Sequence, residues 1–144
     1  MLTLSSKGRY ATRILVFMAR KGKHVSKQEI SYAEDISADY VEQILIKLKT
    51  AGFVRSHRGS KGGFSLARDA DTITVSEVLA ATEGPVCLAP CLSENCVRDL
   101  KCVTKLVWRK ATQALNAAFS GTTIGELARE AEKIHASFEW AYEI

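Results

Sequence analysis

The chain has 144 residues, of which 47% are hydrophobic and 25% are charged. This length suits one domain with at most a small appendage, and the hydrophobic content supports a folded core, which excludes an intrinsically disordered chain. No apolar run reaches the ~18 residues of a membrane span, and no signal-peptide pattern occurs at the N-terminus, so we expect a cytoplasmic protein.

The net charge of +4 is unevenly distributed along the chain. Residues 1–68 carry 13 Lys and Arg against 5 Asp and Glu, whereas residues 69–144 carry 7 against 11. A basic half joined to an acidic half indicates that the first half meets a polyanion and that the second half has a different role.

The first half predicts three helices joined by short connections. Residues 5–21 show apolar positions at helical spacing, and Gly22 ends this helix. Ser26 and Glu29 have the spacing of a capping box, which predicts the start of a second, short helix. Ser37 is the expected N-cap of a third helix. The core-facing stripe of that third helix is Val41, Ile44, Leu45 and Leu48.

Two short runs with strand character follow the helices. They cover residues 53–58 and 64–68, and the glycine-rich segment 59–63 connects them. Such a connection between two strand-like runs predicts a hairpin. Three helices followed by a hairpin is the order of a winged helix-turn-helix, so the expected fold class is mainly α with a small β-hairpin wing.

A winged helix-turn-helix suggests which residues meet double-stranded promoter DNA. The start of the third helix would reach base edges, where Gln can bond adenine and Glu can accept from cytosine. Basic side chains and glycine amides at the wing tip would approach the DNA backbone or the minor groove. The candidate DNA-binding residues are Asp39, Tyr40, Glu42, Gln43 and Lys47 on the third helix, with Arg58 and Lys61 on the wing.

The second half predicts three further helices. Thr74 and Glu77 form another capping box, which opens a fourth helix that ends at Gly84. Thr123 and Glu126 form a third box, which is expected to start a short last helix. The tail, residues 138–142, fits either strand alternation or the end of a helix.

Between them lies a longer helix, which begins near Cys102 and keeps its apolar spacing for about four turns. Such a helix, outside a compact DNA-binding unit, has to bury its stripe on a partner. A second copy of the chain is the simplest partner, and a homodimer would place two reading helices one DNA turn apart. Trp108 is expected to pack in this dimer seam.

All four cysteines lie within residues 87–102, with the spacing C-x3-C-x4-C-x5-C. Stable disulfides are rare in the cytoplasm, and cysteines used as small core residues are scattered, so crowded thiols predict a metal, a cluster or redox chemistry. Four thiolates can hold an iron–sulfur cluster or close a tetrahedral zinc site. Structural zinc usually uses two C-x2-C pairs, so this spacing favours a cluster.

Four motifs in this order resemble the IscR/NsrR-type family of bacterial winged-helix transcription regulators. They are LSSKGRY at 4–10, YVEQ at 40–43, RGSKGGF at 58–64 and CVTKLVWR at 102–109, and the similarity extends to about Glu132. The resemblance implies a homodimer on palindromic promoter DNA and a long helix at the dimer interface. It also implies, as in many members, an iron–sulfur cluster in the loop before that helix.

The resemblance assigns DNA-reading roles to individual residues. Glu42 and Gln43 match the base-reading pair of the family, and Arg58 matches its wing arginine. Asp39 stands where the iron–sulfur assembly regulator has a serine, which implies a different promoter preference.

The resemblance also assigns cluster ligands, and here the chain departs from the family pattern. Cys96 and Cys102 match two cluster cysteines, and Cys91 is the natural third although its spacing is one residue shorter. The assembly regulator has a histidine ligand where this chain has Lys105, whose amine is protonated near neutral pH. Other members use an N-terminal carboxylate of the partner subunit, where this chain has Arg9.

Cys87 therefore remains as the fourth ligand, and the expected metal ligands are Cys87, Cys91, Cys96 and Cys102. Among iron–sulfur clusters we favour [2Fe–2S] over [4Fe–4S]. A cluster-free regulator that uses these cysteines as a thiol–disulfide switch or a zinc site remains the alternative.

The expected organisation is a DNA-binding domain at 1–84, a cluster-binding loop at 85–102 and a dimerisation helix with a tail at 103–144. We expect a dimeric repressor that senses iron–sulfur or redox status. An enzyme is disfavoured, because the sequence contains no Ser–His–Asp set, phosphate-binding loop or dinucleotide fingerprint.

Overall fold

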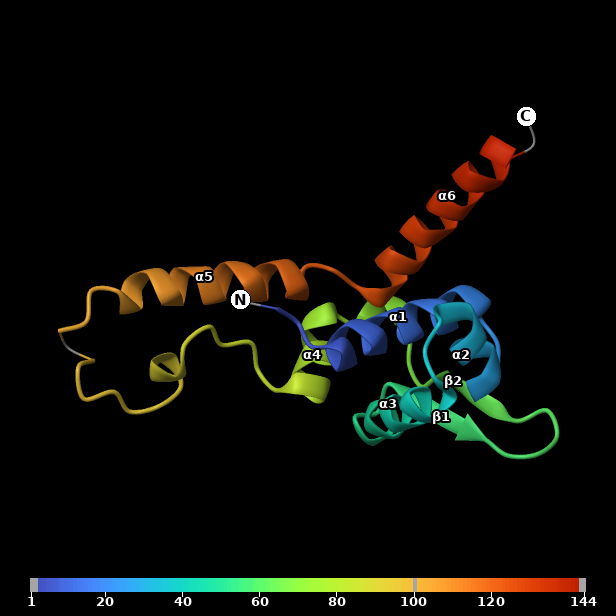
Figure 1. The fold of residues 1–144 in the computed structure, drawn as a ribbon, viewed down its shortest axis with the longest axis horizontal. Helices are drawn as coiled ribbons and strands as arrows, with labels where there is room; N and C mark the ends of the chain where they lie inside the picture. The colour runs from blue at the N-terminus through green and yellow to red at the C-terminus, as the bar shows by residue number, and fades with distance from the viewer. Residues whose placement is uncertain (1–2, 100, 143–144) are drawn as a thin grey trace.

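The computed structural model describes residues 3–99 and 101–142. Two strands form one antiparallel hairpin and helices make up the rest of the regular structure, which confirms the expected fold class (Figure 1). Within these residues, no helix is both long and apolar enough to cross a membrane. The elements are α1 (Ser6–Lys21), α2 (Lys27–Glu34), α3 (Ala38–Thr50), β1 (Val54–His57), β2 (Gly63–Leu66), the 3-10 turn η1 (Ala70–Thr72), α4 (Val75–Glu83), the 3-10 turn η2 (Pro90–Leu92), α5 (Lys105–Ser120) and α6 (Ile124–Tyr142).

The expected helix ends are confirmed by the residues that cap them. At the start of α2 the Glu29 amide donates to the Ser26 hydroxyl at 3.1 Å, while the Ser26 amide donates to the Glu29 carboxylate at 2.7 Å. Gly22 ends α1 in the left-handed conformation, with φ of 61°, which a side chain would disfavour. The same reciprocal box occurs at α4 with Thr74 and Glu77 and at α6 with Thr123 and Glu126.

The hydrophobic core lies between α1, α3 and α4, and α2 and the hairpin pack at its edges. The apolar positions that recur at helical spacing in α1 and α3 point into this core. Each such side chain contributes roughly 1.5–3 kcal/mol on burial. The fully buried residues include Ile14, Leu15, Ile30, Val41, Ile44, Leu45, Leu48 and Val78.

The hairpin is tied to the helix-turn-helix by a third extended segment. β1 and β2 pair in antiparallel register from Val54 opposite Leu66 to His57 opposite Gly63. The connection between α1 and α2 adds to this sheet, because Val25 and Phe64 exchange backbone hydrogen bonds of 2.9 and 2.8 Å. The wing is therefore fixed at its base relative to α1 and α2.

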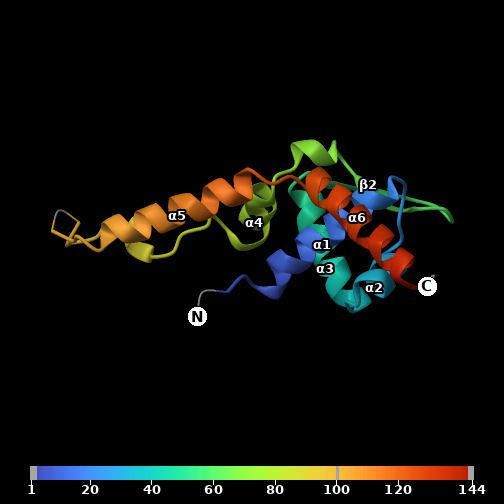
Figure 2. The same cartoon turned by 90° about the horizontal axis from the view of Figure 1, so that it is seen from above.

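The last two helices differ in where they lie. α5 extends away from the core together with the segment that precedes it, whereas α6 returns to α1 (Figures 1 and 2). Ile124, at the start of α6, is fully buried in the core, and Arg20 of α1 pairs with Glu132 of α6 at 2.7 Å. Part of the region expected to serve dimerisation thus packs against the DNA-binding unit.

The expectation of a short last helix was wrong, because α6 has 19 residues and remains helical through residues 138–142. The helical stripe of Leu127, Ala131, Ile134 and Phe138 continues past the first turns. This 3.6-residue period outweighs the short alternation of aromatic residues in the tail, so the helical alternative is the one observed.

Candidate functional site

The outer face of α3 carries four of the predicted DNA-binding residues. The helix buries one stripe in the core, so its polar positions point the other way. The hydroxyl of Ser37 accepts from the Tyr40 amide and caps the helix, which leaves its first turn open at the surface. The exposed residues are Asp39, Glu42, Gln43 and Lys47.

Tyr40 does not lie on the exposed face where the sequence placed it. Its side chain is half-buried, and its ring meets that of Tyr10 edge to face with 5.8 Å between the ring centres. The hydroxyl groups of Tyr40 and Ser6 share a hydrogen bond of 3.1 Å. Tyr40 therefore packs α3 against α1, and its expected base-reading role stays a prediction.

Arg58 and Lys61 lie exposed at the tip of the wing, as predicted. The glycines between them form a tight turn and do not form an open binding site for a phosphate. The Gly62 amide donates to the Gly59 carbonyl at 3.0 Å, and a Cβ on Gly62 would lie 2.3 Å from the His57 carbonyl oxygen. The tip therefore needs glycine to turn tightly, and this tight turn leaves the two cations projecting.

The base of the wing contains a pair of stacked histidines that sequence reasoning missed. The rings of His24 and His57 lie 3.6 Å apart with 17° between their planes, and His57 Nε2 lies 2.7 Å from the Ser65 hydroxyl. The His57 side chain is half-buried between these partners. Partial burial lowers the pKa of His57, and the nearby His24 and Arg55 lower it further.

This lowered pKa predicts a pH-dependent stability. Between the lowered folded pKa and the ordinary value of about 6.5, the unfolded chain binds more protons than the folded one, so stability falls as the pH falls through that window. The urea midpoint of wild type should drop more between about pH 7 and pH 5 than that of His57→Asn. Parallel curves for the two proteins would show that the histidine stack has no such effect.

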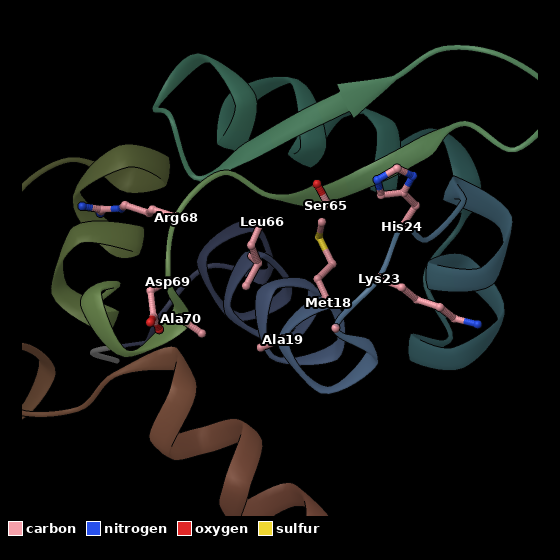
Figure 3. A pocket seen from close by; sticks show the side chains of 10 residues that line it. Met18, Ala19, Lys23, His24, Ser65, Leu66, Arg68, Asp69 and Ala70 are labelled. Carbon is pink, nitrogen blue, oxygen red and sulfur yellow. The ribbon is translucent and has the colours of Figure 1, made fainter.

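A cavity of about 700 Å³ lies behind the wing, between the end of α1, β2 and η1 (Figure 3). Two of its charged lining residues, Lys23 and Arg68, extend in opposite directions in this view. The Arg68 guanidinium pairs with Glu77 at 2.8 Å and lies over the Phe53 ring, so its charge is already satisfied. The lining residues among those described include none of the predicted site residues.

In its described residues, the cysteine segment runs beside α5 as an irregular loop, and its one helical element is the short turn η2 (Figures 1 and 2). Two side chains of α5 hold the start of this loop. The Thr112 hydroxyl accepts from the Leu88 amide at 3.4 Å, and the Asn116 amide donates to the Val86 carbonyl at 3.5 Å. Near its end, Asp99 pairs with Lys105 in the first turn of α5.

The four cysteines are free thiols: Cys87 is exposed, and Cys91, Cys96 and Cys102 are half-buried. In the part of the chain that the structure describes, no three Cys, His, Asp or Glu side chains converge to form a metal site. The Cys87 thiol instead donates to the Ala89 carbonyl at 3.1 Å and lines a cavity beside α4 and α5. The expected four-cysteine ligand set is thus present in one loop without being assembled.

The surroundings of Cys102 favour its thiolate form. The Thr104 hydroxyl, 3.2 Å from Cys102 Sγ, is the main cause of a lowered pKa, and backbone amides at the start of α5 and the Arg98 charge add to it. The donor chemistry therefore suits a metal or cluster, because thiolates are the binding form of cysteine. Lys105 is not an available fourth ligand, since its ammonium group is paired with Asp99.

α5 carries an apolar surface that no other part of the described chain covers. None of its described side chains is buried, and the exposed fraction is 61% for Leu106 and 51% for Val107. Trp108, expected in a dimer seam, is 43% exposed in the protomer. On α5 the side toward α4 and the cysteine loop is the covered one, whereas the side bearing Val107 is open.

Comparison with known proteins relates this geometry to a family. The model of the Rrf2 family, described as an iron-dependent transcriptional regulator, matches residues 4–130. The HTH-type transcriptional regulator IscR of Vibrio vulnificus (strain YJ016) is 34% identical over 139 residues, which cover 94% of this chain and 83% of that protein.

Two solved structures show the same arrangement. CymR, the global cysteine regulator of B. subtilis, matches with a TM-score of 0.80 and 30% identity over 90% of this chain and 98% of that one. IscR of T. potens matches with a TM-score of 0.77 and 29% identity over 92% of this chain and 90% of that one. These relatives confirm the expected regulator class in place of an enzyme. The chain therefore belongs to the Rrf2 family of winged-helix transcription regulators.

Proposed function

We propose that this chain is a homodimeric repressor that binds palindromic promoter DNA and senses iron–sulfur or redox status through a cluster in the loop at 85–102. The observation that carries the DNA-binding part is the placement of two polar surfaces. Helix α3 and the tip of the wing lie on the same side of the molecule, away from α5 and α6 (Figure 1). The outward polar residues of α3 and the two cations of the wing tip are exposed.

The chemistry of this side suits a DNA duplex. With α3 in the major groove, Gln43 would bond a base edge and Asp39 and Glu42 would accept from base amino groups. Lys47 would meet a phosphate, and Arg58 with Lys61 would reach the neighbouring backbone or minor groove. The excess of basic residues in 1–68 supports this orientation, since phosphate contacts supply much of the binding free energy.

The open apolar side of α5 supports dimerisation through that helix. A second copy would cover the Leu106 and Val107 side chains. With twofold symmetry, both copies would use this same surface in the interface. The dimer would present two reading helices to two half-sites of a palindrome.

The cysteine loop fits an iron–sulfur cluster in its donor chemistry, and the names of the IscR relatives support this part of the proposal. The ligands would be Cys87, Cys91, Cys96 and Cys102. The bound cluster would supply reversible one-electron chemistry, and it would be present only when it has been assembled. Because the loop is irregular and the four thiols are apart, holding a common ligand would draw the loop into one ordered conformation.

The same loop offers a route from the sensor to the reading helices. Its start follows α4, which packs in the DNA-binding core, and its contacts with Thr112 and Asn116 reach α5. Ordering the loop would therefore change how α5, and with it the partner protomer, is oriented relative to α3.

The cluster-free alternative would use the same four thiols. The lowered pKa of Cys102 favours the thiolate, from which a thiol–disulfide switch would start. Such a regulator would contain no iron, and one cysteine pair would close under a mild oxidant. A zinc form would contain one zinc ion per chain.

Selection from a random DNA duplex library tests the DNA-binding proposal. The chain should enrich an inverted repeat whose half-sites lie about one helical turn apart, and binding should weaken steeply with salt. Gln43→Ala should relax the preference at one position in each half-site, whereas Gln113→Ala on α5 should leave the selected sequence unchanged. Failure to enrich any sequence over a scrambled pool would contradict the proposal.

A further inference from the structure

The carboxylate of Glu42 is held by a lysine from the neighbouring helix. Lys27 Nζ lies 2.7 Å from Glu42 Oε2, and the two side chains are 26% and 54% exposed. Lys27 is the first residue of α2, and Glu42 lies one turn into α3. The ion pair therefore joins the two helices of the helix-turn-helix at the side chain that is proposed to read a base.

The stability of α2 does not explain a lysine at this position. A positive charge in the first turn of a helix opposes the helix dipole. The acidic residue of the same turn, Glu29, is committed to the capping box through the Ser26 amide, which lowers its pKa. The interaction that the structure provides for Lys27 is the one with Glu42, so a role tied to Glu42 is the more direct explanation.

We infer that Lys27 is a specificity-determining residue that governs how Glu42 responds to the base opposite it. This inference rests on the proposed function, in which α3 enters the major groove. Cytosine and adenine present amino groups there, whereas guanine and thymine present only acceptor oxygens and nitrogens to a carboxylate. An amino group can draw the Glu42 carboxylate to the base, while Lys27 turns to a phosphate.

A base without an amino group leaves the carboxylate on Lys27. The neutralised pair then causes little repulsion toward the base and the phosphates, so the wild-type protein tolerates such a base. Without Lys27, the Glu42 charge would face acceptor atoms and phosphates uncompensated. Lys27 thus broadens the set of promoters that the reading helix accepts, and its removal should narrow that set.

Binding to two duplexes tests this inference. Operators are selected with wild type and with Glu42→Gln. The position at which their base preferences differ is the one that depends on Glu42. Duplexes with cytosine or guanine at that position are then titrated with each protein at one salt concentration. In Lys27→Met the ratio of the two dissociation constants should rise about tenfold, while Lys27→Arg should keep the wild-type ratio. In the Glu42→Gln background, Lys27→Met should weaken both duplexes equally.

Lys47→Met is the matched control, because it removes the same charge from the exposed side of α3 and should weaken both duplexes by one factor. Circular dichroism melting checks that each variant is folded. If Lys27→Met weakens the two duplexes equally in the wild-type background as well as in the Glu42→Gln background, Lys27 is a simple phosphate contact and the inference is overturned. If Glu42→Gln shifts no base preference while wild type still binds its operator, the inference also fails but DNA binding stands. If wild type selects no operator, the proposed function itself fails.

Discussion

Val107→Glu is expected to be a folded monomer that binds promoter DNA at least about a hundredfold more weakly than wild type. The Val107 side chain is half exposed on α5 within the protomer, so a glutamate there meets water and leaves the fold intact. In a dimer built on α5 the same position would be covered. The substitution would then lose about 1.5–3 kcal/mol of apolar burial and add the larger cost of burying a carboxylate.

Two measurements follow the effect of this substitution. Sedimentation velocity gives the oligomeric state, and fluorescence anisotropy gives the affinity for a palindromic duplex. Ser137→Glu is the control, because it adds the same charge to an exposed polar position on α6, outside the apolar side of α5. A Val107→Glu protein that remains a dimer with wild-type affinity would show that α5 is not the dimer interface.

Arg58→Ala is expected to weaken operator binding by about 10- to 100-fold and to lower the slope of log affinity against log salt by roughly two. The side chain projects from the wing tip, where the tight glycine turn leaves it exposed. A dimer would use this arginine twice, once in each half-site. Its loss should therefore remove two phosphate or minor-groove contacts without affecting the core.

Arg129→Ala provides the control for this loss of charge. Arg129 lies on α6, away from α3 and the wing, and forms an exposed ion pair of 2.8 Å with Asp71 (Figure 1). Its removal should leave both the affinity and the salt slope close to wild type. Equal effects of the two substitutions would mean that Arg58 contributes only to the overall charge of the protein.

The fold could be predicted largely from the sequence because its determinants are local. The capping box of Ser26 and Glu29 involves residues three apart, and the stripe of α3 follows from the helical period, so neither depends on distant segments. The glycine-rich turn likewise marked the hairpin. Where two local patterns competed, as in the tail at 138–142, the sequence left the choice open until the continuous helix of α6 was seen.

The parts that could not be predicted depend on contacts between distant segments. Tyr40 looked like a surface residue because its neighbours are polar, yet Tyr10 of α1 covers one side of its ring. Nothing local pairs His24 with His57, which meet only because the connection before α2 joins the wing sheet. The cysteine loop has no periodic pattern, so its sequence does not predict how its thiols are arranged.

The most direct test of the proposed sensor is the metal content of anaerobically purified protein beside that of Cys87→Ala. Wild type should contain about two iron and two sulfide per chain and give an electron paramagnetic resonance signal on reduction, as expected for [2Fe–2S]. Cys87→Ala should lose this signal or shift it, as Cys96→Ala should, whereas Ser93→Ala in the same loop should not. A colourless protein without iron, or a Cys87→Ala spectrum identical to wild type, would contradict a cluster held by all four cysteines.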